Sequence, residues 1–318
     1  MSRALLFAVL LLTASSLAAN EPKNPAAPAA APEKDAPKKE APPLVDPQVT
    51  ITVPGAGEIT MFLDPKDTFF TTMMLAVKGP WETGETHWFV KSIKPGDVVV
   101  DLGAYVGYYT LIAGKLVGDK GKVYAFEPGP DAFALLEKNV RVNKLTNVVL
   151  EQKAVSNKAG SIKLFVSEKH SADNKIYKSA DDPTRPTVDV EAVSLDDYFR
   201  PRDHRVDFVK IDVQGAEGLI LDGMHEVLSW NPHVRMVVEF TPEAMKQAGS
   251  DPYAGARFLK EAGFRFFDIG MADGPRALKE GDPIPILERL AKKYTGSTNF
   301  YLTRNPGPRD VGLNDPAP

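Results

Sequence analysis

The sequence predicts an α/β protein built around a doubly wound, mostly parallel β-sheet with helices on both faces. Residues 98–100 are three valines that run into Asp101, and Gly103 and Gly107 then open a helix-like run. A buried strand, a tight turn and a helix start form the usual first unit of such a sheet. Strand-like and helix-like segments alternate over residues 98–269, which is the pattern of a parallel sheet covered on both faces.

The turn between this strand and this helix is suited to a small ligand. Gly103 permits a positive φ, and Gly107 lets a ligand or a strand approach the helix closely. The first helical turn leaves unpaired N–H groups, which favour an anionic group. A dinucleotide-binding turn needs glycine at its middle position, where this chain has Tyr105. The turn therefore disfavours pyrophosphate, and a dehydrogenase is only a third alternative.

Acidic residues end four of the predicted strands: Asp101, Glu127, Asp212 and Glu239. The carboxyl ends of parallel strands share one edge of an open sheet, where ligands bind near the reversal of strand order. Asp101 would repel phosphate but bind an ammonium group, and Glu127 is placed to accept hydrogen bonds from ribose hydroxyls. S-adenosylmethionine combines an amino-acid end and a nucleoside end without phosphate, so it is the predicted cofactor. The alternative is a Rossmann-like turn with incidental acids.

The bulk composition is that of a globular protein. The 318 residues are 43% hydrophobic and 25% charged, with a formal net charge of -4. This mild acidity does not favour nucleic acid as a partner. The chain has no cysteine, which excludes disulfides, thiolate metal sites and a cysteine nucleophile.

The N-terminal residues are typical of a bacterial export signal. Arg3 is the positive residue, 4–12 form the apolar core and 16–18 form a small-residue cleavage site, so 1–19 is the predicted signal peptide. Residues 20–47 are rich in Pro, Ala and Lys and predict a disordered linker. The apolar core is short for a membrane span, so no stable span is expected after cleavage. We expect export to the periplasm or cell envelope; the alternative is an uncleaved N-terminal anchor.

The folded domain is predicted to cover residues 48–303, followed by a disordered tail at 304–318. It begins with a small β/α extension. Residues 49–53 and 58–63 alternate like the two strands of a hairpin, and 69–77 follow as a helix that Asp67 could cap.

Four later segments also carry predictions. Residues 147–150 form a third strand whose continuation brings Ala154 beside the adenine in this architecture. Apolar spacing over 219–228 predicts one helix, and 270–285 read as a loop. Residues 167–186 form a long polar loop, either functional or mobile and solvated. Four of its side chains could hydrogen-bond a hydroxylated acceptor: His170, Ser171, Asn174 and Tyr177.

The chain resembles the FkbM-type family of S-adenosylmethionine-dependent methyltransferases from about Gly79 to Thr303. The resemblance implies a Rossmann-like class I methyltransferase fold with seven strands, the last antiparallel, and methyl transfer to an acceptor hydroxyl. It also implies cofactor contacts at the residues Asp101, Gly103, Ala104, Tyr105, Gly107, Glu127 and Ala154. The segments that carry it are 94–97, 100–110, 125–128, 147–156, 194–197 and 209–217.

Two departures from the family pattern concern the site. The family usually has Glu where this chain has Gln214, and Asn-x-Gly where this chain has Tyr105-Val-Gly107. The first departure removes a charge, whereas Tyr105 can still cap the cofactor pocket. With Gln214 in place of a third acid, a divalent metal on Asp212 and Glu239 is not expected.

Methyl transfer is an in-line displacement, so positioning carries most of the rate. A hydroxyl acceptor still benefits from a carboxylate within hydrogen-bond reach of its proton. Asp212 and Glu217 are the predicted catalytic residues, and Lys210 is less suited because it lies inside the strand. The alternatives are that Asp212 caps the following helix and that Glu217 satisfies local backbone groups.

Two classes of function follow. The first is an O-methyltransferase acting on a hydroxyl of a sugar, a glycan or a small metabolite, with an acceptor bound by the polar loop or by the helix bearing Trp81 and Glu82. The second is an exported, catalytically silent Rossmann-like binding protein that uses the same pocket. The intact glycine turn and Glu127 favour the enzyme. Gln214 and the export signal favour the binding protein, because S-adenosylmethionine is made in the cytoplasm. The oligomeric state is left open.

Overall fold

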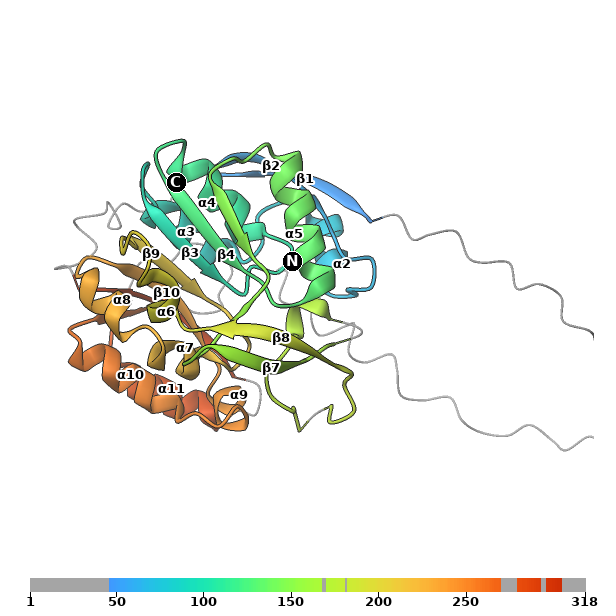
Figure 1. Ribbon diagram of the computed structural model, residues 1–318. Helices are drawn as coiled ribbons and strands as arrows, with labels where there is room; N and C mark the ends of the chain where they lie inside the picture. The colour runs from blue at the N-terminus through green and yellow to red at the C-terminus, as the bar shows by residue number, and fades with distance from the viewer. Residues whose placement is uncertain (1–45, 168–169, 181, 270–278, 293–295, 305–318) are drawn as a thin grey trace, which may run out of the picture. The chain divides into compact units, whose positions relative to one another are not determined.

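Runs of β-branched and aromatic residues form the central sheet (Figure 1), to which the described residues contribute eight strands. The computed structural model describes residues 46–167, 170–180, 182–269, 279–292 and 296–304. The strand order across the sheet is β12 (Lys279–Glu280), β11 (Arg265–Asp268), β13 (Thr298–Thr303), β10 (Arg235–Phe240), β9 (Phe208–Ile211), β3 (Val98–Leu102), β4 (Lys122–Phe126) and β5 (Val148–Glu151).

The sheet is mostly parallel, as the sequence predicts, and the two-residue edge strand β12 adds an eighth strand to the seven expected. β3 pairs in parallel with both β4 and β9, whereas β13 pairs antiparallel with β10 and β11. β3 is the first strand of the sheet along the chain, and the next strands, β4 and β5, lie on the side away from β9. The strand order therefore reverses between β3 and β9, which is where open α/β sheets bind ligands.

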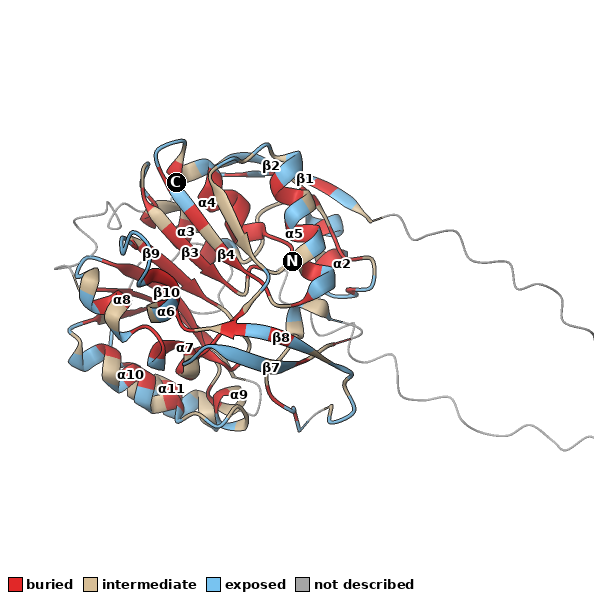
Figure 2. Ribbon diagram, in the orientation of Figure 1, coloured by how far each residue is buried: buried red, intermediate tan, exposed pale blue. Residues whose placement is uncertain are grey.

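Helices cover both faces of the sheet (Figure 1). One apolar core lies under α3 (Thr83–Ser92), α4 (Tyr108–Val117) and α5 (Pro130–Val142). A second core lies on the other face, and Figure 2 shows buried residues concentrated in the strands between them. The helices that pack on the second core are α6 (Leu195–Phe199), α7 (Glu217–Asp222), α8 (His225–Trp230), α9 (Pro242–Gln247), α10 (Pro252–Glu261) and α11 (Pro283–Ala291).

The predicted β/α extension precedes α3. It consists of the hairpin β1 (Gln48–Val53) and β2 (Gly57–Phe62), followed by α2 (Phe70–Val77). The Asn139 side chain of α5 holds the hairpin by bonding both the N–H and the C=O of Phe62, at 2.7 and 2.9 Å. Asp67 Oδ1 accepts the N–H groups of Phe69 and Phe70, so the predicted cap of this helix is confirmed.

A small second sheet follows the central strands β3 to β5. Its order is β6 (Ala154–Val155), β8 (Thr187–Val193) and β7 (Gly160–Phe165). Ala154 and Leu164 are buried in its own small core. The polar segment predicted at 167–186 connects β7 with β8, so its two ends are anchored in neighbouring strands.

Two predictions about elements are wrong. Residues 219–228 do not form one helix, because α7 ends at Asp222 and α8 begins at His225. A Cβ atom on Gly223 would lie 2.4 Å from the carbonyl oxygen of Ser156, so the break brings two backbones into contact. The end of the predicted loop 270–285 instead contains β12 and the start of α11.

Several predicted segments lie outside the described residues. These are the signal at 1–19, the linker up to residue 45, the first part of the loop 270–285 up to residue 278, and the tail from residue 305. Within the described part of the chain, no helix is long and apolar enough to cross a membrane.

Candidate active site

The glycine turn after β3 brings the chain into contact with the end of β9. Gly103 has a φ of +81°, and a Cβ atom there would lie 1.9 Å from the carbonyl oxygen of Asp212. The N–H groups of Gly103 and Ala104 each donate to the carbonyl oxygen of Phe126 at 3.0 Å. β4 and β9 therefore hold the turn from both sides, and only glycine fits at position 103.

Glu127 follows β4 and shapes the next part of the turn. Its Oε2 accepts the N–H of Tyr105 at 2.8 Å and its Oε1 accepts the N–H of Gly129 at 2.7 Å. The residue is 6% exposed, and this burial raises the pKa of its carboxyl group to about 7. Each oxygen keeps a lone pair for another donor. Glu127 also lines the adjoining cavity, where the sequence predicts a partner for ribose hydroxyls.

The cavity lies at the carboxyl edge of the sheet, between the turns after β3, β4 and β9 and the small sheet. Five of the nine predicted site residues line it: Gly103, Tyr105, Glu127, Ala154 and Asp212. Sequence reasoning missed part of its wall, although strand-like alternation over 161–166 was a signal for one member, Leu164. The other missed residues are Leu102, Phe126, Pro128, Lys153, Val155, Ala172, Ile176, Val213 and Ala216, whereas Gln214, which the sequence singles out as a departure from the family pattern, also lines the cavity.

Three predicted cofactor residues lie behind this wall. Asp101 is 1% exposed, and its Oδ2 accepts the hydroxyl of Thr110 at 2.6 Å, so it connects β3 with α4. Burial raises the pKa of Asp101. Ala104 is buried, and Gly107 caps α4 with a φ of +98°. These residues shape the turn, and a direct contact with the cofactor stays a prediction for each.

Two cavity residues other than glycine have left-handed backbone conformations. Tyr105 has a φ of +51° and Gln214 a φ of +55°. Such strain persists only where surrounding contacts impose it, and it is common at functional sites. The hydroxyl of Tyr105 bonds to Ser171 Oγ at 2.9 Å and to Asp67 Oδ2 at 3.3 Å. The turn is therefore tied to α2 and to the polar segment.

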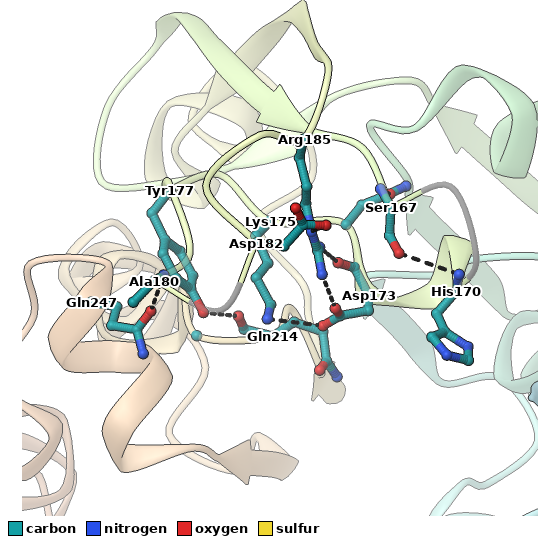
Figure 3. Close-up of polar contacts among 12 residues, drawn as sticks. Ser167, His170, Asp173, Lys175, Tyr177, Ala180, Asp182, Arg185, Gln214 and Gln247 are labelled. Carbon is teal, nitrogen blue, oxygen red and sulfur yellow. Dashed lines mark hydrogen bonds and ion pairs between the residues drawn. The ribbon is translucent and has the colours of Figure 1, made fainter. Parts of the chain in front are cut away.

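The described part of the polar segment is folded against the site. Figure 3 shows the Tyr177 hydroxyl directed to the backbone oxygen of Gln214, at 3.1 Å. Asp173 forms ion pairs with Lys175 and Arg185 at 3.1 and 2.6 Å. Ser171 and Asn174 line the cavity. Two of the four predicted acceptor contacts thus lie beside the cofactor turn.

Asp212 stands at the end of β9 in a group of polar side chains. Its Oδ2 lies 2.9 Å from Lys210 Nζ, and its Oδ1 accepts Gln214 Nε2 at 2.9 Å. Gln214 Nε2 also lies 3.2 Å from Glu239 Oε2. The amide at position 214 thus donates to two carboxyl groups, which a glutamate carboxylate could not do.

These contacts determine which of the carboxyl groups of Asp212 and Glu239 is ionised. Partial burial opposes ionisation of Asp212, but the Lys210 ammonium and the hydrogen bonds from Lys210, Glu239 and Gln214 outweigh it and lower its pKa. Burial and the neighbouring Asp212 carboxylate raise the pKa of Glu239 well above its ordinary value. Asp212 is therefore the ionised member of the pair.

Glu217, the second predicted catalytic residue, is fully buried at the start of α7. Its Oε1 accepts the N–H of Gly215 at 2.9 Å, and Thr241 Oγ1 lies 3.4 Å from its Oε2. Burial raises its pKa to about 7. Glu217 is not part of the cavity wall, so this geometry favours its alternative role as a partner of local backbone groups.

α3 adds carboxyl groups that sequence analysis did not place at this edge. Glu85 Oε1 lies 3.5 Å from Lys210 Nζ, and the Tyr109 hydroxyl donates to Glu82 Oε2 at 3.2 Å. Lys210 Nζ lies 4.4 Å from the centre of the Tyr109 ring. Glu82, from the alternative acceptor-binding helix, is therefore joined to Asp212 through Tyr109 and Lys210. Among the described residues, no group of three His, Cys, Asp or Glu is arranged to hold a metal ion.

The doubly wound sheet with antiparallel β13, the glycine turn and the acidic edge define a Rossmann-like class I methyltransferase. The family model of the methyltransferase FkbM domain matches residues 101–266, more than half of the chain. The chain belongs to this FkbM methyltransferase family, as its motifs predict.

Several relatives are named as methyltransferases. The chain is 29% identical to 31-O-demethyl-FK506 methyltransferase FkbM of Streptomyces tacrolimicus over 46% of this chain and 65% of that protein. It is 29% identical to hexuronic acid methyltransferase AglP of Haloferax volcanii over 52% of this chain and 62% of that protein. It therefore spans less than two thirds of either relative. A crystal structure of methyltransferase FkbM from Methylobacillus flagellatus covers 68% of this chain and 50% of its own, with 12% identity and a TM-score of 0.39.

S-adenosylmethionine is the cofactor of this family, and the side chains that line the cavity suit it chemically. Glu127 presents buried carboxylate oxygens that can accept ribose hydroxyls. Apolar side chains suited to an adenine ring line the same wall: Leu102, Phe126, Ala154 and Val155.

Proposed function

We propose that this protein is an S-adenosylmethionine-dependent O-methyltransferase that acts on a hydroxyl of a sugar, a glycan or a small metabolite. The observation that carries the proposal is Asp212, an ionised carboxylate that lines the cofactor cavity. Two relatives support it by name: one refers to an O-methyl position and the other to a hexuronic acid.

S-adenosylmethionine supplies the methyl group in this reaction. Asp212 accepts a hydrogen bond from the acceptor hydroxyl and so aims the oxygen for in-line attack. The hydroxyl becomes strongly acidic as its oxygen gains a third bond, so even a carboxylate with a lowered pKa can take its proton. Lys210 and Gln214 hold the Asp212 carboxylate in place through its two oxygens.

Gln214 is compatible with this role although the family usually has glutamate. Its amide donates to both Asp212 and Glu239, at 2.9 and 3.2 Å. A third carboxylate would add a negative charge to this group and raise the pKa values of its members. The amide therefore helps Asp212 to stay ionised.

The test is transfer of isotope-labelled methyl groups to a panel of methyl glycosides and hydroxylated small molecules. Asp212→Asn should lower transfer about 10²-fold, the scale for losing a positioned base, with little change in cofactor affinity. The control is Asp131→Asn, because the Asp131 side chain is 75% exposed on α5. Full transfer by Asp212→Asn would contradict the proposal. Cofactor binding without transfer to any acceptor would support the silent binding protein instead.

A further inference from the structure

An aromatic cluster on the N-terminal extension lies beside the candidate active site. Phe69, at the start of α2, is 47% exposed although it is a large apolar side chain. Its ring centre lies 6.0 Å from that of Trp81 and 6.2 Å from that of His170. Trp81 also contacts Phe70 at 5.1 Å. Exposed aromatic groups of this kind often mark binding sites.

The cluster is connected to the cofactor cavity by direct contacts. The Phe70 ring lies 5.4 Å from that of Tyr105, which lines the cavity. His170 is followed by Ser171, which bonds to the Tyr105 hydroxyl and lines the same cavity. An acceptor on the cluster would therefore border the cofactor.

The residue after Trp81 carries a carboxyl group held in a strained conformation. Glu82 has a φ of +42° at the N-terminus of α3. The preceding residue is fixed through both of its backbone groups: Trp81 N–H donates to the Tyr108 hydroxyl at 3.0 Å, and Trp81 C=O accepts Thr86 Oγ1 at 2.6 Å. Strain of this kind persists only where surrounding contacts impose it, as these two hydrogen bonds do.

Glu82 is also joined to the proposed base. The Tyr109 hydroxyl bonds to Glu82, the Tyr109 ring packs against Lys210 Nζ, and Lys210 bonds to Asp212. Burial and the carboxylates of Glu85 and Asp212 raise the pKa of Glu82 to about 8. Its carboxyl group is therefore largely protonated at neutral pH and can both donate to and accept from hydroxyl groups.

We propose that Phe69, Trp81 and Glu82 form the acceptor subsite and that this subsite takes a neutral sugar ring. The inference rests on the proposed function. The C–H faces of a sugar ring pack on aromatic side chains, and its hydroxyls bond to a carboxyl group. A uronic acid is disfavoured, because its carboxylate would lie near the ionised Asp212, whose charge the ammonium of Lys210 already balances.

The test measures binding with the full chain saturated with S-adenosylhomocysteine. The probes are methyl glycosides of glucose, galactose and mannose, with methyl glucuronoside as the acidic comparison. Calorimetry or saturation-transfer NMR should detect binding of a neutral glycoside and weaker binding of the uronoside. Phe69→Ala and Glu82→Ala should each weaken binding of the neutral glycoside roughly fivefold or more, with unchanged affinity for S-adenosylhomocysteine.

Two variants serve as controls. Glu82→Gln keeps a donor and an acceptor and should restore most of the affinity that Glu82→Ala loses. Leu75→Ala, at a 37% exposed position of the same helix, should bind glycosides as the wild type does. Absence of neutral-glycoside binding, equal or tighter binding of the uronoside, or equal losses in Leu75→Ala and Phe69→Ala would overturn the proposal.

The two proposals fail separately. If Phe69→Ala and Glu82→Ala transfer methyl groups with an unchanged acceptor KM, the subsite proposal is refuted and the proposed O-methyltransferase activity holds. If the two variants weaken glycoside binding but no acceptor is methylated, the subsite proposal holds and the proposed O-methyltransferase activity is refuted.

Discussion

Asp101 and Glu127 both lie at the carboxyl ends of parallel strands, but only Glu127 lines the cavity. Asp101 directs Oδ2 to Thr110 behind the turn, whereas Glu127 holds two backbone N–H groups at its mouth. The difference arises because Asp101 belongs to the buried strand β3 itself, and Glu127 comes one residue after β4. In the register of the two strands, Glu127 lies two positions beyond Asp101, and this offset separates a structural acid from one that lines the cavity.

We predict that Glu127→Ala weakens S-adenosylmethionine binding by about 1.5–3 kcal/mol, the scale for losing a charged hydrogen-bond partner. Calorimetry measures the change, and NAD should not bind appreciably. Glu151→Ala is the matched control, because Glu151 ends the neighbouring strand β5 and bonds to the Tyr198 hydroxyl at 2.7 Å. An unchanged affinity in Glu127→Ala, or tight NAD binding, would reverse the assignment of the cofactor contact.

The buried Glu217 should make the stability of the protein depend on pH. Burial raises its folded-state pKa to about 7 from its ordinary value of 4.5. Below about pH 4.5 the group is protonated in both states, and as pH rises the unfolded chain loses this proton first. The stability linked to the proton is therefore lost as pH rises through about 7.

Glu217→Gln removes this titration and keeps an acceptor for the Gly215 N–H. The free energy of unfolding of the wild type, relative to that of the variant, should fall on the order of 1–3 kcal/mol between pH 4.5 and pH 7.5. Denaturant unfolding at several pH values measures it. Methyl transfer should change less than about tenfold; a loss near 10²-fold would instead support the predicted catalytic role.

At the scale of elements, the site depends on the contact between the ends of β3 and β9. The turn at Gly103 approaches Asp212 so closely that the two strand ends form one structural unit. The small sheet completes the cavity, because it places Ala154 and Leu164 in the wall. Tyr177 then ties the segment after β7 to the turn after β9.

Gly103→Ala should destabilise the protein because of this close contact. The added Cβ would overlap the Asp212 carbonyl oxygen, so we expect the free energy of unfolding to fall by more than about 3 kcal/mol. Gly57→Ala is the control, since Gly57 has nearly the same φ, +80°, with nothing within 4 Å of an added Cβ. It should cost about 1 kcal/mol, from φ alone. Equal losses in denaturant unfolding would refute the steric argument.

At the scale of the whole molecule, the remaining question is where the protein acts. The apolar core at 4–12 and the Ser-Leu-Ala at 16–18 lead us to propose export. We expect a mature N-terminus near Ala19 or Asn20. N-terminal sequencing of protein from fractionated cells tests this, and full-length protein in the cytosol would count against it. An uncleaved protein in the membrane fraction would favour the anchor.

The sequence by itself determined the sheet, the glycine turn and the class of cofactor. Valine-rich strands, positive-φ glycines and acids at strand ends are local patterns, and each acts over a few residues. β3 and β4, the turn at Gly103 and the cavity position of Glu127 agree with these predictions. The cap by Asp67 agrees for the same reason.

Only the tertiary structure decided which residues share the site. Gln214 lies between Asp212 and Glu239, and its role depends on two strands joined by a parallel ladder. Glu82 meets the same edge from α3, far earlier in the chain. The break at Gly223 likewise depends on its contact with Ser156. Such contacts join segments distant in sequence, so packing of the folded chain creates them and no local pattern encodes them.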